Sequence, residues 1–268
     1  ARVDLGQTAT VAATYSEDRW RAETHQKLKT RAVDFTYGTA IDLKMFQKTR
    51  ADISLFAGKT KHRYARGSAD TDALGVAASV NFVTNAGTHY AAFVSASKTT
   101  SKGHVATTDA SHRVKLDTRA FAAGLYVGFP YAVTDTFSIE PYASGIAYKM
   151  HFDRSHSGDL SYAFKNHDRS LATFGVKGSW ENASHALKIT GALAWIHRFD
   201  STSKASGVSS TATAAWDLEK ISESFGKASL GLTWQASDKL SVNLTGATYK
   251  SRTVKPIFEA GASLRYVF

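Results

Sequence analysis

Histidine, serine and aspartate are the residues of this chain that could do chemistry. Ten His side chains are present, and His151, His156 and His167 lie in one polar stretch where imidazoles could chelate an ion. A Ser-His-Asp triad is also arithmetically possible. However, the chain has no HExxH, no GxSxG, no P-loop and no GxGxxG after a strand. We therefore predict that these residues are solvated, with no catalysis, no metal site and no cofactor.

Cysteine is absent, and the balance of charges is basic. Zero Cys excludes disulfides, thiolate metal sites and Cys nucleophiles. The formal net charge is +10, which could suit a nucleic acid. The Lys and Arg residues are spread along the chain, and the basic run at 59–66 is predicted to lie in a loop at the end of a strand. We therefore expect surface contacts with the phosphates of lipopolysaccharide and no nucleic-acid partner.

The elements that must position these residues are β-strands. Apolar and polar residues alternate along most of the chain, as in 125–131 and 187–199, and helical periodicity is scarce. About twelve such segments can be counted, many of them roughly ten residues long, which is the length a tilted strand needs to cross a bilayer. The fold class predicted is all-β, a transmembrane antiparallel β-barrel that occupies 1–268 as one domain.

The two faces of these strands differ in a way that favours a membrane barrel. The alternate residues on one face of each strand form a continuous apolar file, which is expected to face lipid. Near strand ends this file contains interfacial aromatics, namely Trp180, Trp195, Trp234, Tyr131 and Tyr266. The polar file mixes charges with Gly, Ser and Thr, which suits a wet lumen. The residues predicted to line that lumen are Asp34, Asp42, Lys44, Glu140, Lys177, Lys188, Arg198, Glu259 and Arg265.

The connections between strands alternate between short and long. The short ones are expected at 46–50, 85–87, 132–135, 181–184 and 236–239, and the long polar ones at 16–30, 62–72, 99–115, 153–168 and 201–225. Short periplasmic turns and long extracellular loops are typical of bacterial outer-membrane barrels. The last segment must then pair with the first near residues 7–15, because an open sheet edge cannot lie in lipid.

Three stretches stand out along the chain, namely YGTAIDLKMF (37–46), FSIEPYASGIAYKMHFD (137–153) and FEAGASLRYVF (258–268). Together they resemble the C-terminal translocator (β) domain of autotransporters, the type V secretion proteins of Gram-negative bacteria. In the last stretch, Leu264, Tyr266 and Phe268 alternate outward, and Phe268 would meet the barrel-assembly machinery at the periplasmic rim. The resemblance implies a monomeric outer-membrane barrel that anchors and exports its own N-terminal passenger, which we expect upstream of Ala1.

Other functions remain open at this point. A free-standing channel or porin of about twelve strands would show the same alternation and the same parity of loops. A membrane-embedded hydrolase and a soluble β-sandwich lectin are further alternatives. The resemblance also carries no self-cleavage activity over to this chain, because the Asn-Asn pair at which some autotransporters cleave themselves is missing.

Overall fold

The computed structural model describes residues 7–19, 27–41, 43, 46–64, 67–106, 111–153, 155–157, 160–164, 167–200, 203–208, 213–218, 223–251 and 256–268. All regular elements there are strands. Their bounds are β1 (Thr8–Arg19), β2 (Lys27–Ala40), β3 (Lys48–Tyr64), β4 (Gly67–Val83), β5 (His89–Ala106), β6 (Ser111–Gly128), β7 (Tyr131–Ala132), β8 (Phe137–Phe152), β9 (Ser155–Ser157), β10 (Leu160–Phe164), β11 (His167–Glu181), β12 (Leu187–Asp200), β13 (Ser203–Val208), β14 (Thr213–Leu218), β15 (Glu223–Gln235), β16 (Leu240–Lys250) and β17 (Ile257–Val267).

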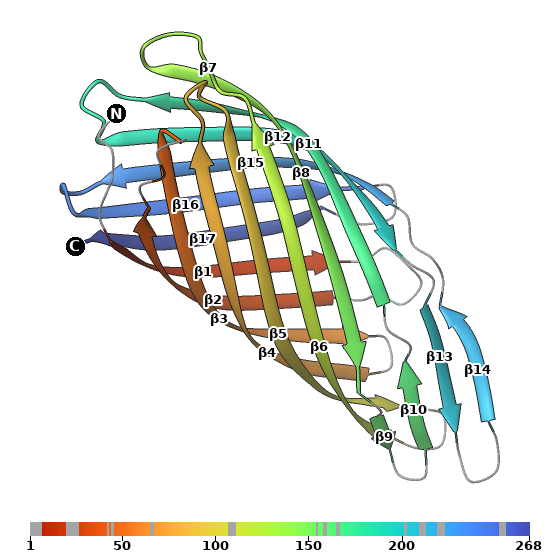
Figure 1. Cartoon of the computed structure of the whole chain (residues 1–268). Coiled ribbons are helices and arrows are strands. Elements are labelled where there is room, and N and C mark those ends of the chain that lie inside the picture. The colour runs from red at the N-terminus through yellow and green to blue at the C-terminus, as the bar shows by residue number, and fades with distance from the viewer. Residues whose placement is uncertain are drawn as a thin grey trace.

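Twelve of these strands form one closed antiparallel barrel (Figure 1). The wall runs β1, β2, β3, β4, β5, β6, β8, β11, β12, β15, β16 and β17. It closes where Thr8 pairs with Val267 and Tyr15 pairs with Ala260, which confirms the predicted pairing of the last strand with the first. Closure leaves this sheet without a free edge, so its backbone groups are satisfied within the wall.

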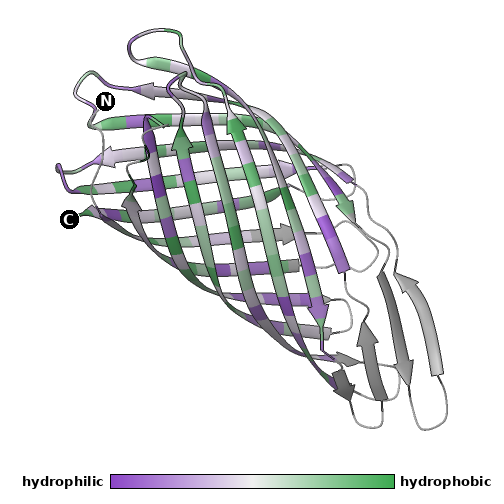
Figure 2. Ribbon diagram, viewed as in Figure 1, coloured by the Kyte–Doolittle hydropathy of each residue, from purple (hydrophilic) through white to green (hydrophobic). Residues whose placement is uncertain are grey.

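The outer wall carries the apolar residues of the alternating strands. Figure 2 shows hydrophobic and hydrophilic residues alternating along these strands. Leu125 on β6 is 70% exposed and Leu193 on β12 is 69% exposed, whereas Glu140 on β8 is only 5% exposed. This inversion of the usual soluble pattern is what a lipid-facing surface requires. The predicted interfacial aromatics are all on this exposed surface, although Trp195 lies in the interior of β12 and not near its end.

The strands extend further than predicted at the end of the barrel opposite the termini, which we call the long-loop end. β3 and β4 continue through most of 62–72 with paired backbones, from Lys59↔Asp72 to Tyr64↔Gly67. The predicted loop at 62–72, and the loop placement of the basic run 59–66, are therefore wrong. Parts of 16–30 and 99–115 are strand as well, and β9, β10, β13 and β14 form a separate sheet within 153–168 and 201–225. These strands were not predicted, because polar residues on both of their faces give no alternation of apolar and polar residues.

The opposite end, which we call the short-turn end, holds the start of β1 and the end of β17 (Figure 1). Its turns include 84–88, where Gly87 adopts a φ of 84° that favours glycine. The predicted turn at 46–50 is shifted, since β3 already begins at Lys48. No helix in the part of the chain that the structure describes is long and apolar enough to cross a membrane.

Candidate functional site in the barrel lumen

The inner face of the wall combines aromatic rings with glycines on neighbouring strands. The rings of Phe56 and Phe93 lie where a Cβ at Gly75 or at Gly124 would stand. A Cβ at Gly75 would also approach the Ala96 carbonyl oxygen to 2.8 Å. These two inward rings therefore pack against the wall, at positions where only glycine leaves room for them.

A buried carboxylate lies near the short-turn end of this lumen. Glu140 on β8 accepts a hydrogen bond from the Tyr126 hydroxyl of β6 at 2.5 Å, and its other oxygen lies 2.6 Å from Lys177 Nζ on β11. His89 Nδ1 of β5 lies 3.2 Å from the first oxygen. Four neighbouring strands thus converge on one side chain, in a register that places Lys177 directly opposite Glu140.

Two features support this cluster, one steric and one electrostatic. Gly128 on β6 leaves the space that the Glu140 carboxylate occupies, because a Cβ there would collide with Oε1. The Lys177 side chain is 35% exposed, so its ammonium neutralises the carboxylate while keeping contact with the lumen. A buried carboxylate with three polar partners is stable in its ionised form, and it fixes the four strands relative to one another.

A second polar group lies on β3 at the same end. Arg50 donates from Nε to Asp52 Oδ1 at 2.7 Å and from its guanidinium to the Thr8 hydroxyl of β1. Asn81 Nδ2 of β4 lies 3.3 Å from the other Asp52 oxygen. This group spans the seam near the closing strands, since β1 is the strand that pairs with β17.

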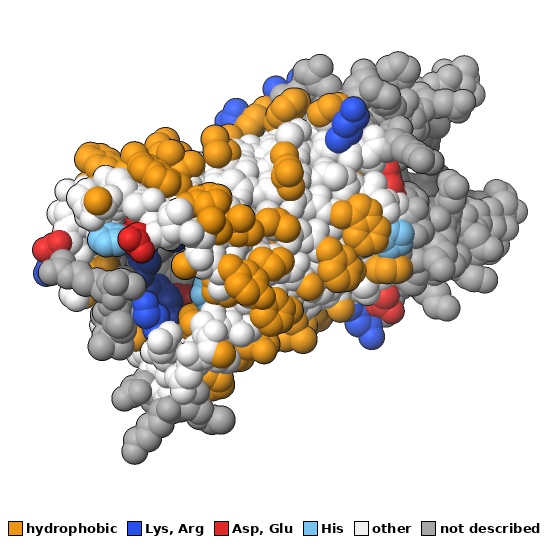
Figure 3. Space-filling view, turned by 90° about the horizontal axis from the view of Figure 1, so that it is seen from above, with side chains coloured by type: hydrophobic (Ala, Val, Ile, Leu, Met, Phe, Trp, Pro, Cys, Tyr) orange, Lys and Arg blue, Asp and Glu red, His pale blue; other side chains and the backbone are white. Residues whose placement is uncertain are grey.

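The two groups border one hollow of 600 Å³ inside the barrel. Arg50, His89, Tyr126, Glu140 and Lys177 line it, together with Ala192 of β12 and Arg265 of β17. Figure 3 shows an opening at the short-turn end around which charged side chains gather. This part of the lumen therefore offers charges of both signs and many hydrogen-bonding groups, which can hold water or contact a polar chain.

Polar residues continue toward the long-loop end. Arg198 is 8% exposed, and its guanidinium lies 5.8 Å from the centroid of the Phe225 ring. The Tyr249 hydroxyl donates to Glu259 at 2.8 Å, and Lys227 Nζ lies 4.9 Å from the centroid of the Tyr249 ring. The lumen thus stays polar well beyond the short-turn end.

The predicted lumen residues do not form one site. Glu140, Lys177 and Arg265 border the same hollow. Asp34 accepts a hydrogen bond from Thr36 on its own strand, and Lys188 is exposed at the start of β12. Asp42 and Lys44 lie outside the described residues. Leu264, Tyr266 and Phe268 are exposed on the outer wall, and their part in assembly remains a prediction.

Sequence reasoning missed two residues of the Glu140 cluster and two of the neighbouring group. Tyr126 and His89 contact Glu140, while Arg50 and Asp52 form the neighbouring group. The sequence does place Tyr126 on the lumen-facing side of its strand, because it alternates with Gly124 and Gly128 in the polar file. Arg50 was assigned to a turn, which concealed its inward direction.

The histidines singled out as possible ligands do not converge in the part of the chain that the structure describes. His151 is exposed on the outer wall, whereas His167 pairs with Met150 on the inner face. The side chain of His156 lies outside the described residues. Among the described side chains, no three His, Asp or Glu residues form a group that could hold a metal ion.

Comparison with known proteins identifies the family. The sequence model of the family described as autotransporter beta-domain matches residues 34–247. The chain belongs to the autotransporter β-domain family. Membership of this family, together with the closed barrel, implies a translocator barrel in an outer membrane.

Solved structures of autotransporter β-domains share the fold. The β domain of Bordetella BrkA aligns with a TM-score of 0.80 at 12% identity, covering 98% of this chain and 100% of that chain. The translocator domain of NalP from Neisseria meningitidis gives 0.79 at 12% identity, over 98% and 88%. The transport unit of AIDA-I from Escherichia coli gives 0.68 at 14% identity, over 98% and 90%. No curated protein matches the sequence.

Proposed function

We propose that this autotransporter β-domain anchors an N-terminal passenger in the outer membrane of a Gram-negative bacterium and exports it to the cell surface, without catalysis of its own. The observation that carries the proposal is the charged lumen of a closed twelve-stranded wall. Its polar lining would keep a passing polypeptide solvated. Its cross-strand bonds would hold the wall rigid while that polypeptide passes.

The orientation follows from the two ends of the barrel. The short-turn end would face the periplasm and the long-loop end the outside, as in other outer-membrane barrels. β1 starts at the short-turn end, so a segment preceding it would reach the lumen from the periplasmic side. The monomeric barrel would contact outer-membrane lipid and lipopolysaccharide around its wall.

The last strand supplies the proposed signal for assembly. Leu264, Tyr266 and Phe268 present a row of apolar side chains at the short-turn end of the outer wall. The Tyr266 and Phe268 rings contact each other edge-on, with centroids 5.2 Å apart. The barrel-assembly machinery would recognise this row before β17 pairs with β1.

A fusion protein tests the export function. A signal peptide and a protease-sensitive reporter are placed before residue 1, and whole cells are treated with external protease. We expect the reporter to be digested while the barrel remains in the outer membrane. A free-standing channel would instead leave the reporter in the periplasm and conduct ions in a planar bilayer.

The fusion needs a folding control to be decisive. Heat-modifiable migration in SDS reports whether the same preparation contains closed barrel. A folded barrel whose reporter stays protected from protease, with a periplasmic marker intact, would contradict the proposal.

A further inference from the structure

A cationic arc borders the apolar outer wall on one side of the barrel. It lies among the outward-facing residues of six neighbouring strands, each followed from the short-turn end to the long-loop end. The first charged residue on each is Arg31 on β2, Lys59 on β3, Asp72 on β4, Lys98 on β5, Arg119 on β6 and Lys149 on β8, so five of the six are cations. Figure 3 shows Lys and Arg side chains at the border of the apolar wall.

The arc covers only part of the circumference. The outer files of β12, β15 and β17 contain no Lys or Arg among their described residues, and that of β16 carries Lys250 at its end. Charges needed only for solubility outside the membrane would be expected on every strand. The concentration of cations on β2 to β8 therefore points to a specific anionic contact on that side.

Two pairs in the arc place like charges directly opposite each other. Arg31 pairs in register with Lys59, and Lys98 pairs with Arg119. Such cross-strand pairs destabilise a sheet in the absence of a counterion. Lys59 lies 3.6 Å from Asp72 and Arg119 lies 3.8 Å from Asp153, but these are exposed contacts that relieve little repulsion.

Another acid on the same surface is already engaged. Asp117 accepts a hydrogen bond from the Thr100 hydroxyl at 2.6 Å and lies 3.1 Å from Lys115 Nζ. These hydrogen bonds from Thr100 and Lys115 hold the pKa of the Asp117 carboxyl below its ordinary value. Asp117 and Lys115 thus largely neutralise each other, and Asp168 lies directly opposite Lys149 in the register of β8 and β11. The side chains of Lys98, Arg119 and Lys149 remain exposed on the outer file.

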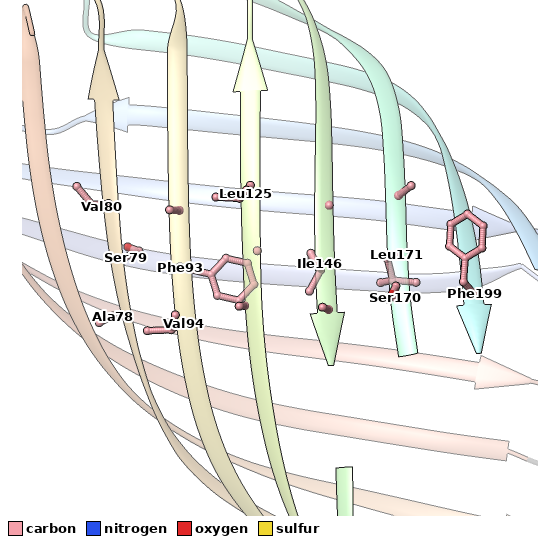
Figure 4. A pocket seen from close by; sticks show the side chains of 16 residues that line it. Ala78, Ser79, Val80, Phe93, Val94, Leu125, Ile146, Ser170, Leu171 and Phe199 are labelled. Atoms are coloured by element: carbon pink, nitrogen blue, oxygen red, sulfur yellow. The ribbon is translucent and has the colours of Figure 1, made fainter. Parts of the chain in front are cut away.

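An apolar hollow of 960 Å³ lies beside this part of the arc, on the outer surface of β4 to β12. Its outward side chains include Ala92, Val94, Ala123, Leu125 and Ala147, and Figure 4 shows several of its lining residues. A second hollow of 510 Å³ shares Val94, Ala123 and Ala147 with it and reaches Lys149 and Asp168. The apolar surface is therefore continuous with the cations.

These features together select one kind of occupant. Phosphate groups pair with Lys and Arg through charge-assisted hydrogen bonds. The adjoining hollows are of the size that holds small ligands and are lined mainly by apolar side chains, so they suit hydrocarbon chains. A ligand that fills both must carry phosphate on a headgroup directly above acyl chains. In the outer leaflet, where the proposed orientation puts the long-loop end, the lipid A part of lipopolysaccharide is the lipid of this kind.

We propose that the arc formed by Lys98, Arg119 and Lys149, with the hollow beside it, is a binding site for lipid A on the outer wall. The site rests on the orientation in the proposed function, which puts the long-loop end in the outer leaflet. Bound phosphates would cancel the repulsion between Lys98 and Arg119, so lipid binding would also stabilise the extended strands β5 and β6.

Binding of purified, bis-phosphorylated lipid A to the detergent-solubilised barrel tests the site. The variant K98Q/R119Q/K149Q is expected to bind it about tenfold or more weakly than the wild type, since charge-assisted bonds to phosphate are lost. The control K188Q/K239Q/K250Q removes the same net charge away from the arc and should bind normally. Dephosphorylated lipid A should bind the wild type as weakly as the bis-phosphorylated form binds the arc variant.

The outcomes separate this site from general charge effects and from export. Equal losses in both triple variants, or equal affinity for phosphatidylglycerol and lipid A, would overturn the proposal. Unchanged affinity in the arc variant would overturn it as well. Heat-modifiable migration verifies folding, and R119Q alone serves if the triple variant does not fold. Reporter export is scored separately, so failure of lipid binding leaves the proposed function to its own test.

Discussion

Glu140 shows how a single carboxylate can organise the lumen. It is 5% exposed and engages Lys177, Tyr126 and His89 on three other strands. A buried carboxylate is costly unless it is paired and hydrogen-bonded, and here each oxygen has a partner. The side chain therefore acts as a link between strands as well as a charge in the lumen.

Replacing Glu140 with glutamine should weaken the barrel. E140Q removes the charge that pairs with Lys177, and we expect a loss of about 1–3 kcal/mol in the free energy of unfolding. Urea titration of the barrel in detergent, followed by heat-modifiable migration, measures it. E259Q is the matched control, because Glu259 is exposed and should lose less than about 1 kcal/mol. Equal losses in both variants would contradict a structural role for the cluster.

At the scale of the element, the last strand has two faces with different demands. Tyr266 is 42% exposed on the apolar outer wall, whereas Val267 alternates to the lumen side. A charge on the outer face must enter the lipid interface and disturb the proposed assembly signal. The same charge on the inner face remains in contact with water.

A pair of aspartate substitutions tests this difference. Y266D should prevent insertion into the outer membrane, and deletion of Phe268 should have a similar effect. V267D carries the same new charge one residue away and should insert close to normally. Membrane fractionation with heat-modifiable migration measures both, and equal insertion of Y266D and V267D would exclude a face-specific signal.

The extended hairpin of β3 and β4 makes a second prediction at this scale. β3 pairs with β2 as far as Arg63 and with β4 as far as Tyr64, so amides at 60–64 are bonded in a continuous sheet. Hydrogen exchange there should be slowed by at least about a hundredfold relative to an unstructured chain, although the segment lies beyond the apolar wall. Exchange at the rate of an unstructured chain would contradict the extended hairpin and support the loop that was predicted from sequence.

Some features of these strands could be predicted from the sequence, and others could not. The strand number followed from apolar alternation, since lipid requires an apolar face along every wall strand. The closure of β17 on β1 followed because an open sheet edge cannot lie in lipid. The extensions at 59–66 did not, because water accepts polar residues on both faces. Glu140 was found, but Tyr126 and His89 were missed because contacts across strands depend on register, which alternation does not specify.

For the whole molecule, closure predicts unusual resistance to detergent. Its twelve strands pair around a complete circle, so no edge offers a place for unfolding to start. We expect the unheated barrel to migrate faster in SDS than the boiled protein, with a β-type circular dichroism spectrum. Identical migration of both samples would be inconsistent with a closed wall.

The central claim is that a passenger crosses the lumen, and site-specific photo-crosslinking tests it most directly. Ala192 lines the charged hollow, whereas the neighbouring Leu193 is 69% exposed on the outer wall. A photo-reactive amino acid at 192 should crosslink to a passenger stalled during export, and one at 193 should not. Passenger that reaches the surface without crosslinking at 192, or that crosslinks equally from both positions, would contradict passage through this lumen.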